Sequence, residues 1–117
     1  MDLEPYLRTL RRRDDALVAE QERRSSAIRA RLPEVVRILV EELGVRRVVL
    51  FGSLRGGSFH ERSDLDLAVA GLDPRAYWRA LDLVGRAAGV EVDLVLLEEA
   101  SPSLRRRIDE DGELLHG

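Results

Sequence analysis

Residues 51–67 read FGSLRGGSFHERSDLDL, and this stretch decides the fold expected for the chain. It starts at the end of the apolar run Val48-Val49-Leu50-Phe51, which predicts a buried strand. Gly52 and Ser53 end that strand sharply, because glycine permits a tight turn. At the other end of the stretch, Leu65 and Leu67 alternate with acidic residues. This alternation predicts a second strand with one face in the core.

Carboxylates are the first candidate functional groups. Asp64 and Asp66 are two residues apart in the predicted second strand, so both side chains project from the same face. Asp93 interrupts the apolar run Val92-Asp-Leu-Val-Leu, where an acid is costly unless it meets a cation or hydrogen-bond donors. If the two strands are neighbours, the three acids suit Mg²⁺, which prefers carboxylate, phosphate and water oxygens. The alternative is an edge strand with solvated acids.

The Gly52-Ser53 turn is a candidate phosphate site. Glycine lets the backbone approach a ligand closely, and the serine hydroxyl and neighbouring N–H groups can donate to phosphate oxygens. Arg55 could pair with a triphosphate, and Gly57 keeps the following loop free of bulk. Glycine–serine pairs are also common in ordinary turns, so this signal alone is weak.

Around this stretch the patterns predict an α/β domain. Residues 3–31 form one long helix or two shorter ones, and Pro33 begins another helix that Gly44 ends. Further helices are expected over residues 75–88 and from residue 101 to about 111, and a third strand over 90–97. The result is a small mixed sheet covered by helices on one face, with His116 in a frayed tail. We divide the chain into a helical extension, 1–32, and the main domain, 33–117.

Composition excludes several chemistries. The 117 residues contain no cysteine, which rules out disulfides, thiolate nucleophiles and cysteine-bound zinc, and all 19 basic residues are Arg, so no lysine takes part in catalysis. The net charge of −3 makes nucleic acid an unlikely partner for the molecule as a whole. Neither a signal-peptide pattern nor an apolar run of membrane-spanning length is present, which predicts a cytoplasmic protein that contacts no membrane.

Together these residues resemble the DNA polymerase β-like nucleotidyltransferase superfamily in its minimal form. The shared pattern is an apolar strand, Gly-Ser, ten intervening residues, Asp-x-Asp and a later Asp in a strand. Its positions are matched by Gly52, Ser53, Asp64, Asp66 and Asp93. The resemblance spans residues 46–97 and continues more weakly through the last helix. Many minimal members carry Ala-Arg-Gly after Gly-Ser, whereas here Arg55 is shifted by one residue and Gly57 still matches.

The resemblance implies a polymerase β-like nucleotidyltransferase fold and a site for two magnesium ions and an NTP. Ser53 would contact the phosphates, Asp64 and Asp66 would bridge the metals, and Asp93 would bind the metal beside the attacking group. Minimal members of this size are often antitoxins encoded beside a HEPN ribonuclease toxin, and they transfer AMP from ATP to a tyrosine of that toxin. A HEPN toxin and ATP are therefore the expected partner and substrate.

Two other functions stay open at this point. The chain could modify a small molecule or an RNA end, although relatives that do so are usually larger. It could also be a non-catalytic antitoxin that neutralises its partner by contact alone. The sequence does not decide whether the chain forms homo-oligomers, or whether its N-terminal helix faces a partner or packs on the domain.

Overall fold

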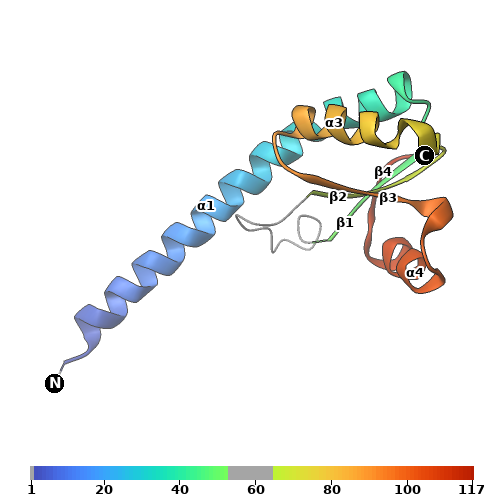
Figure 1. Cartoon of the computed structure of the whole chain (residues 1–117). Helices are drawn as coiled ribbons and strands as arrows, with labels where there is room; N and C mark the ends of the chain where they lie inside the picture. The colour runs from blue at the N-terminus through green and yellow to red at the C-terminus, as the bar shows by residue number, and fades with distance from the viewer. Residues whose placement is uncertain (1, 53–64) are drawn as a thin grey trace.

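The computed structural model describes residues 2–52 and 65–117, which form a four-stranded sheet, helices on both of its faces and a long N-terminal arm (Figure 1). No helix in this part of the chain is both long and apolar enough to span a membrane. The described elements are, in chain order, α1 (Glu4–Arg37), the π-helical turn η1 (Ile38–Glu42), β1 (Arg47–Phe51), β2 (Leu65–Ala70), the 3-10 turn η2 (Pro74–Ala76), α3 (Tyr77–Ala88), β3 (Val92–Leu96), the 3-10 turn η3 (Leu97–Glu99), α4 (Pro102–Asp111) and β4 (Glu113–His116).

The sheet is mixed, as the sequence predicts. Its strand order is β3-β2-β1-β4, with β1 antiparallel to β2 and β4, and β2 parallel to β3. The expectation of a frayed tail was wrong, because His116 belongs to β4 and is the register partner of Val48. A strand of four residues is stabilised by its hydrogen bonds to a distant strand, and those are invisible in local sequence.

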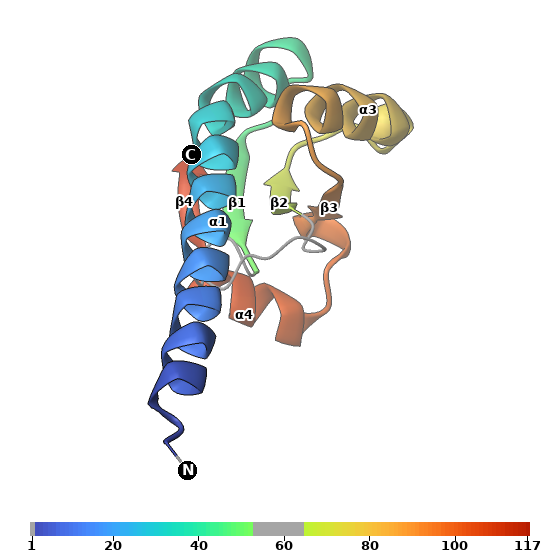
Figure 2. The same cartoon turned by 90° about the vertical axis from the view of Figure 1, so that its left-hand side faces the viewer.

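Each face of the sheet has its own core, because side chains alternate along each strand. Helices α1 and α3 cover one face, whose buried strand residues include Leu50 and Leu67. Helix α4 covers part of the other face, where Ile108 packs in a cluster with Val49, Ala68 and Leu97. Figures 1 and 2 show α3 and α4 on opposite sides of the strands. The expectation that helices cover only one face was therefore wrong.

Helix α1 runs without a break through Pro33, so the prediction of a second helix beginning there was wrong. A proline inside a helix removes one hydrogen bond and costs about 3 kcal/mol. Here Ile28, Leu32 and Val35 bury their side chains on either side of it. Their burial offsets that cost, since each apolar side chain removed from water contributes about 1.5–3 kcal/mol. The division of the chain at residue 32 stays a prediction.

Tyr77 joins α3 to the edge strand β3. Its hydroxyl donates a hydrogen bond of 2.8 Å to the carbonyl of Leu94. Tyr77→Phe is expected to lower the free energy of unfolding by about 1 kcal/mol in urea denaturation, since one hydrogen bond is lost. Tyr6→Phe is the control, because Tyr6 is 64% exposed on α1. Equal losses of unfolding free energy in both variants would contradict a stabilising role for the hydrogen bond between Tyr77 and Leu94.

Candidate active site

Two acids lie side by side on neighbouring strands. Asp66 in β2 and Asp93 in β3 are register partners in the parallel pair. Leu65 and Leu67 flank Asp66 and are completely buried in the core under α1 and α3, so Asp66 projects from the opposite face. By the same alternation Asp93 shares that face with Asp66, since its neighbour Leu94 belongs to the same core as Leu65 and Leu67. Two carboxylates thus meet on one surface, one half-buried and the other exposed.

A glycine turn closes on the Asp66 carboxylate. Strand β1 ends at Phe51, the register partner of Asp66, and Gly52 follows with a φ of +77°. A Cβ atom at residue 52 would overlap the Oδ2 atom of Asp66. Glycine is required at residue 52 for two reasons. The left-handed backbone disfavours residues with a side chain, and the Asp66 carboxylate occupies the position that a Cβ atom would take. The end of β1 and the start of β2 are therefore fixed against each other at this point.

The face that carries the two acids is divided between core and open surface. Further along the strands, Ala68 and Val95 pack with Leu97 and Ile108 beneath α4. The small side chain of Ala68 lets the helix approach the sheet. Asp66 and Asp93 lie nearer the end at which β1 finishes. Asp93 at this end of the face is exposed, whereas α4 covers the part of the face around Ala68.

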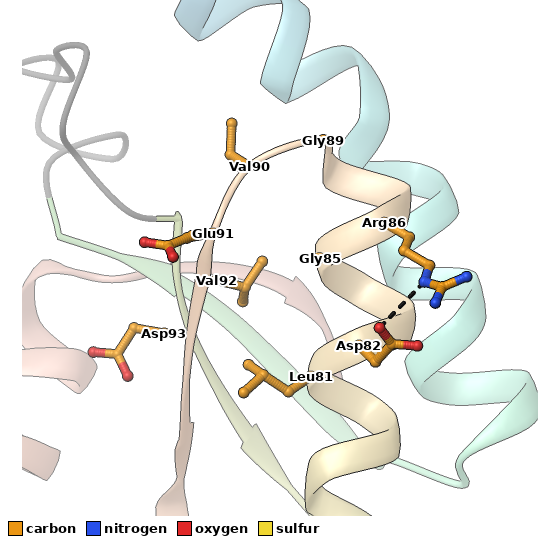
Figure 3. Close-up of a pocket in the computed structure, with 9 residues that line it drawn as sticks. All are labelled: Leu81, Asp82, Gly85, Arg86, Gly89, Val90, Glu91, Val92 and Asp93. Carbon is orange, nitrogen blue, oxygen red and sulfur yellow. Dashed lines mark hydrogen bonds and ion pairs between the residues drawn. The ribbon is translucent and has the colours of Figure 1, made fainter.

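A groove of about 660 Å³ adjoins Asp93 at the outer edge of β3. One wall is the C-terminal half of α3, where Gly85 leaves space and Arg86 pairs with Asp82 at 3.1 Å. Figure 3 shows Glu91 and Asp93 pointing to one side of β3, away from α3. β3 is the edge strand of the sheet formed by residues 2–52 and 65–117, so no strand of those residues closes this side. The Asp93 side chain is exposed at this edge and points away from the α3 wall of the groove.

The structure brings together the predicted site residues that it describes. Gly52 lies against Asp66, and Asp66 lies beside Asp93. Four further predicted residues fall outside the described ranges, namely Ser53, Arg55, Gly57 and Asp64. Within residues 2–52 and 65–117, no group of three acidic or histidine side chains is close enough together to hold a metal ion. The complete metal-binding trio therefore stays a prediction.

Sequence reasoning missed the groove. The available signal was the spacing of Leu81, Gly85 and Gly89, which puts Gly85 on the face of α3 that carries Leu81 and puts Gly89 directly after the end of the helix. The sequence does not show that β3 runs alongside this helix. Without that fact, Gly85 indicates only a residue of low helix propensity, and Gly89 indicates only the end of the helix.

Comparison with known proteins decides the family. A profile of the nucleotidyltransferase domain matches residues 32–115, which is most of the chain and includes all of the sheet except His116, the last residue of β4. The chain belongs to the nucleotidyltransferase domain family. This assignment agrees with the resemblance seen in the sequence and with the observed fold. Residues 2–31, most of helix α1, lie outside the match.

Similar nucleotidyltransferases include a curated relative and two solved structures. Protein adenylyltransferase MntA of Shewanella oneidensis is 32% identical over 88 residues, which are 72% of this chain and 63% of that protein. A toxin–antitoxin crystal structure with AMP-PNP has a TM-score of 0.63 and 31% identity, over 72% of each chain. A structure of tri-AMPylated Shewanella oneidensis HEPN toxin in complex with MNT antitoxin has a TM-score of 0.62 and 28% identity, over 77% of this chain and 72% of that one.

Proposed function

We propose that this nucleotidyltransferase is a magnesium-dependent protein adenylyltransferase. It transfers AMP from ATP to a tyrosine of a HEPN ribonuclease toxin in the cytoplasm, and so acts as the antitoxin. The observation that carries the proposal is the pairing of Asp66 with Asp93 on one open face of the sheet, beside the Gly52 turn. Support for the nucleotide and the partner comes from relatives named as an adenylyltransferase and as antitoxins in complex with toxins, one with AMP-PNP.

The residues present suit magnesium. Asp66 and Asp93 offer carboxylate oxygens from adjacent strands, and hard oxygen ligands are what Mg²⁺ prefers. Asp64, two residues before Asp66, would add the third carboxylate. When bound, magnesium would neutralise phosphate charge and favour in-line displacement at phosphorus. Two carboxylates on neighbouring strands add their negative charges at one place, which attracts a divalent cation.

The chain's own residues would orient the two substrates. The turn formed by Gly52 and Ser53, with Arg55 and Gly57, would hold the triphosphate through N–H, hydroxyl and guanidinium donors. Asp93 is exposed at the sheet edge and would orient the incoming tyrosine hydroxyl. The tyrosine oxygen then forms a bond to the α-phosphorus of ATP. The bond from that phosphorus to the bridging oxygen breaks, pyrophosphate leaves, and the tyrosine proton passes to solvent.

Transfer of a labelled nucleotide tests the proposal. The purified chain, a HEPN ribonuclease toxin and ATP labelled at the α-phosphate are incubated with magnesium. We expect label on the HEPN protein, its loss when EDTA removes the metal, and its recovery when magnesium is restored. Label on a tyrosine, located by peptide mass spectrometry, would identify the acceptor.

The same experiment separates the alternatives. Inhibition of the ribonuclease without any label on it would overturn the catalytic proposal in favour of neutralisation by contact. Label found on an RNA end or a small molecule, with none on the HEPN protein, would instead assign a different acceptor. Transfer that continues unchanged in EDTA would contradict the role of magnesium.

A further inference from the structure

Strand β3 lies at the edge of the sheet, so one row of its main-chain groups has no partner strand in the described part of the chain. The N–H of Leu65 in β2 donates to the carbonyl of Glu91 at 2.9 Å, so Glu91 and Asp93 turn their main-chain groups toward β2. Val92 and Leu94 therefore turn theirs outward, where the Leu94 carbonyl accepts a side-chain hydrogen bond from α3. The outward N–H and C=O of Val92 are a template for another strand.

The two sides of this edge offer different surroundings to an added strand. On one side lies the groove between β3 and α3, and Figure 3 shows the side chains of Val92 and Leu81 on this side. On the other side the Asp93 side chain is exposed. Successive side chains of an extended segment point to opposite sides. A segment paired with β3 would therefore place one side chain in the groove and the next beside Asp93.

Gly85 keeps the groove open although glycine weakens a helix. Alanine is a better helix former than glycine in the interior of a helix such as α3. Lack of space does not explain the glycine, since an added Cβ atom would meet only the carbonyl oxygen of Val90, at 3.8 Å. A longer side chain at residue 85 would instead enter the groove, which Gly85 lines. The room that Gly85 leaves is enough for a side chain of a bound segment.

Trp78 extends the wall of the groove along α3. It lies three residues before Leu81 and seven before Gly85, and these spacings put the three residues on one face of the helix. The Trp78 side chain is 76% exposed. Tryptophan is enriched among the residues that anchor protein interfaces. An exposed aromatic side chain thus continues the apolar surface next to the open strand edge.

We propose that the acceptor protein presents its tyrosine on an extended segment that pairs with the outer edge of β3. The inference rests on the proposed function, since that reaction brings a tyrosine of another protein to Asp93. In the paired segment the tyrosine lies on the Asp93 side, and its neighbours in sequence point into the groove. An apolar neighbour fits there, against Leu81 and Val92. Main-chain pairing supplies affinity in this mode of recognition, and the groove supplies specificity.

Amide hydrogen exchange on the full chain tests the strand pairing. A HEPN ribonuclease toxin is added without ATP, so the result does not depend on AMP transfer. The N–H of Val92 is expected to exchange at least about tenfold more slowly in the complex, because it then donates to the added strand. The N–H of Asp93 is the internal control, since it faces β2 and should already be protected in the free chain. Unchanged exchange at Val92 in the saturated complex would overturn the proposal.

Filling the groove tests its role in recognition. Gly85→Leu is expected to bind the toxin at least about tenfold more weakly without ATP, because the leucine side chain would occupy the space of the segment's apolar side chain. In the transfer assay the KM for the toxin should rise by the same factor, while kcat and the KM for ATP stay within about twofold. Urea denaturation should show no loss of stability, since leucine favours a helix more than glycine does. Gly85→Ala is the matched control and should bind within about threefold of the unmodified chain, because a methyl group leaves most of the groove open.

Trp78→Ala is expected to weaken toxin binding at least about fivefold. Tyr6→Ala is its control, since Tyr6 is also an exposed aromatic side chain but lies on α1, 64% exposed. An equal effect of the two substitutions would contradict a specific contact at α3.

The docking mode and the proposed function can fail separately. A chain that protects Val92 on toxin binding but transfers no AMP would support the docking mode and overturn the proposed function. A chain that transfers AMP while Gly85→Leu and Gly85→Ala bind the toxin equally well would overturn the docking mode alone.

Discussion

Asp93→Asn is expected to lower AMP transfer to the partner protein at least about 100-fold, while the free energy of unfolding changes by no more than about 0.5 kcal/mol. The amide keeps the shape of the carboxylate but carries no negative charge, so it binds magnesium more weakly than the carboxylate does. Stability is expected to hold because Asp93 is exposed and its neighbour Leu94 keeps its place in the core. Transfer of label from α-labelled ATP measures the first effect, and urea denaturation measures the second.

Glu91→Gln is the matched control for this prediction. Glu91 points to the same side of β3 as Asp93 and also borders the groove (Figure 3). Both substitutions remove one negative charge from the same surface. If charge at the metal position matters, Glu91→Gln keeps most of its activity. Equal losses in the two variants would show that general surface charge, and not a specific ligand, explains the effect.

Gly52→Ala is expected to abolish transfer, with a loss of at least about 100-fold from misplacement of the Asp66 carboxylate. Residue 52 has a φ of +77°, and the new methyl group would occupy the position of Asp66 Oδ2. The variant should also lose stability, since a left-handed backbone costs about 1–2 kcal/mol for an L-residue with a side chain. Activity and urea denaturation are measured on the same preparation.

Gly44→Ala separates backbone strain from the contact with Asp66. Gly44 has a similar φ of +71°, but a Cβ atom there would meet nothing within 4 Å. The Gly44→Ala variant should therefore lose about as much stability as Gly52→Ala does from the left-handed backbone, but it should keep its activity. The difference between the two glycine variants then measures what the methyl group does to Asp66. Normal transfer by Gly52→Ala would contradict a catalytic role for the carboxylate that it displaces.

Much of the site was predictable because it depends on local sequence. Alternation along residues 65–70 predicts that Leu65 and Leu67 enter the core while Asp66 faces away, and the structure confirms this. A positive φ at Gly52 is what a sharp turn after an apolar strand requires. The spacing of Gly52, Ser53, Asp64, Asp66 and Asp93 was enough to suggest the family to which the domain profile assigns the chain.

Other features depend on partners that are distant in sequence. Local rules predicted that Pro33 begins a helix, but burial of Leu32 and Val35 on the sheet carries the helix through it. Likewise β4 exists only because β1 offers hydrogen bonds to its backbone. Helix α4 packs on the second face because Ile108 meets Val49 and Ala68 there.

The sequence by itself therefore determined three of the four strands, the turn and the acids that the chain offers, because side-chain alternation and glycine conformation are properties of adjacent residues. Only the tertiary structure decided that Asp93 lies beside Asp66, that a groove opens along β3, and that the N-terminal part of α1 extends into solvent. Strand order and helix packing arise from the burial of apolar surface between segments far apart in the chain. No local pattern specifies which of those segments will meet.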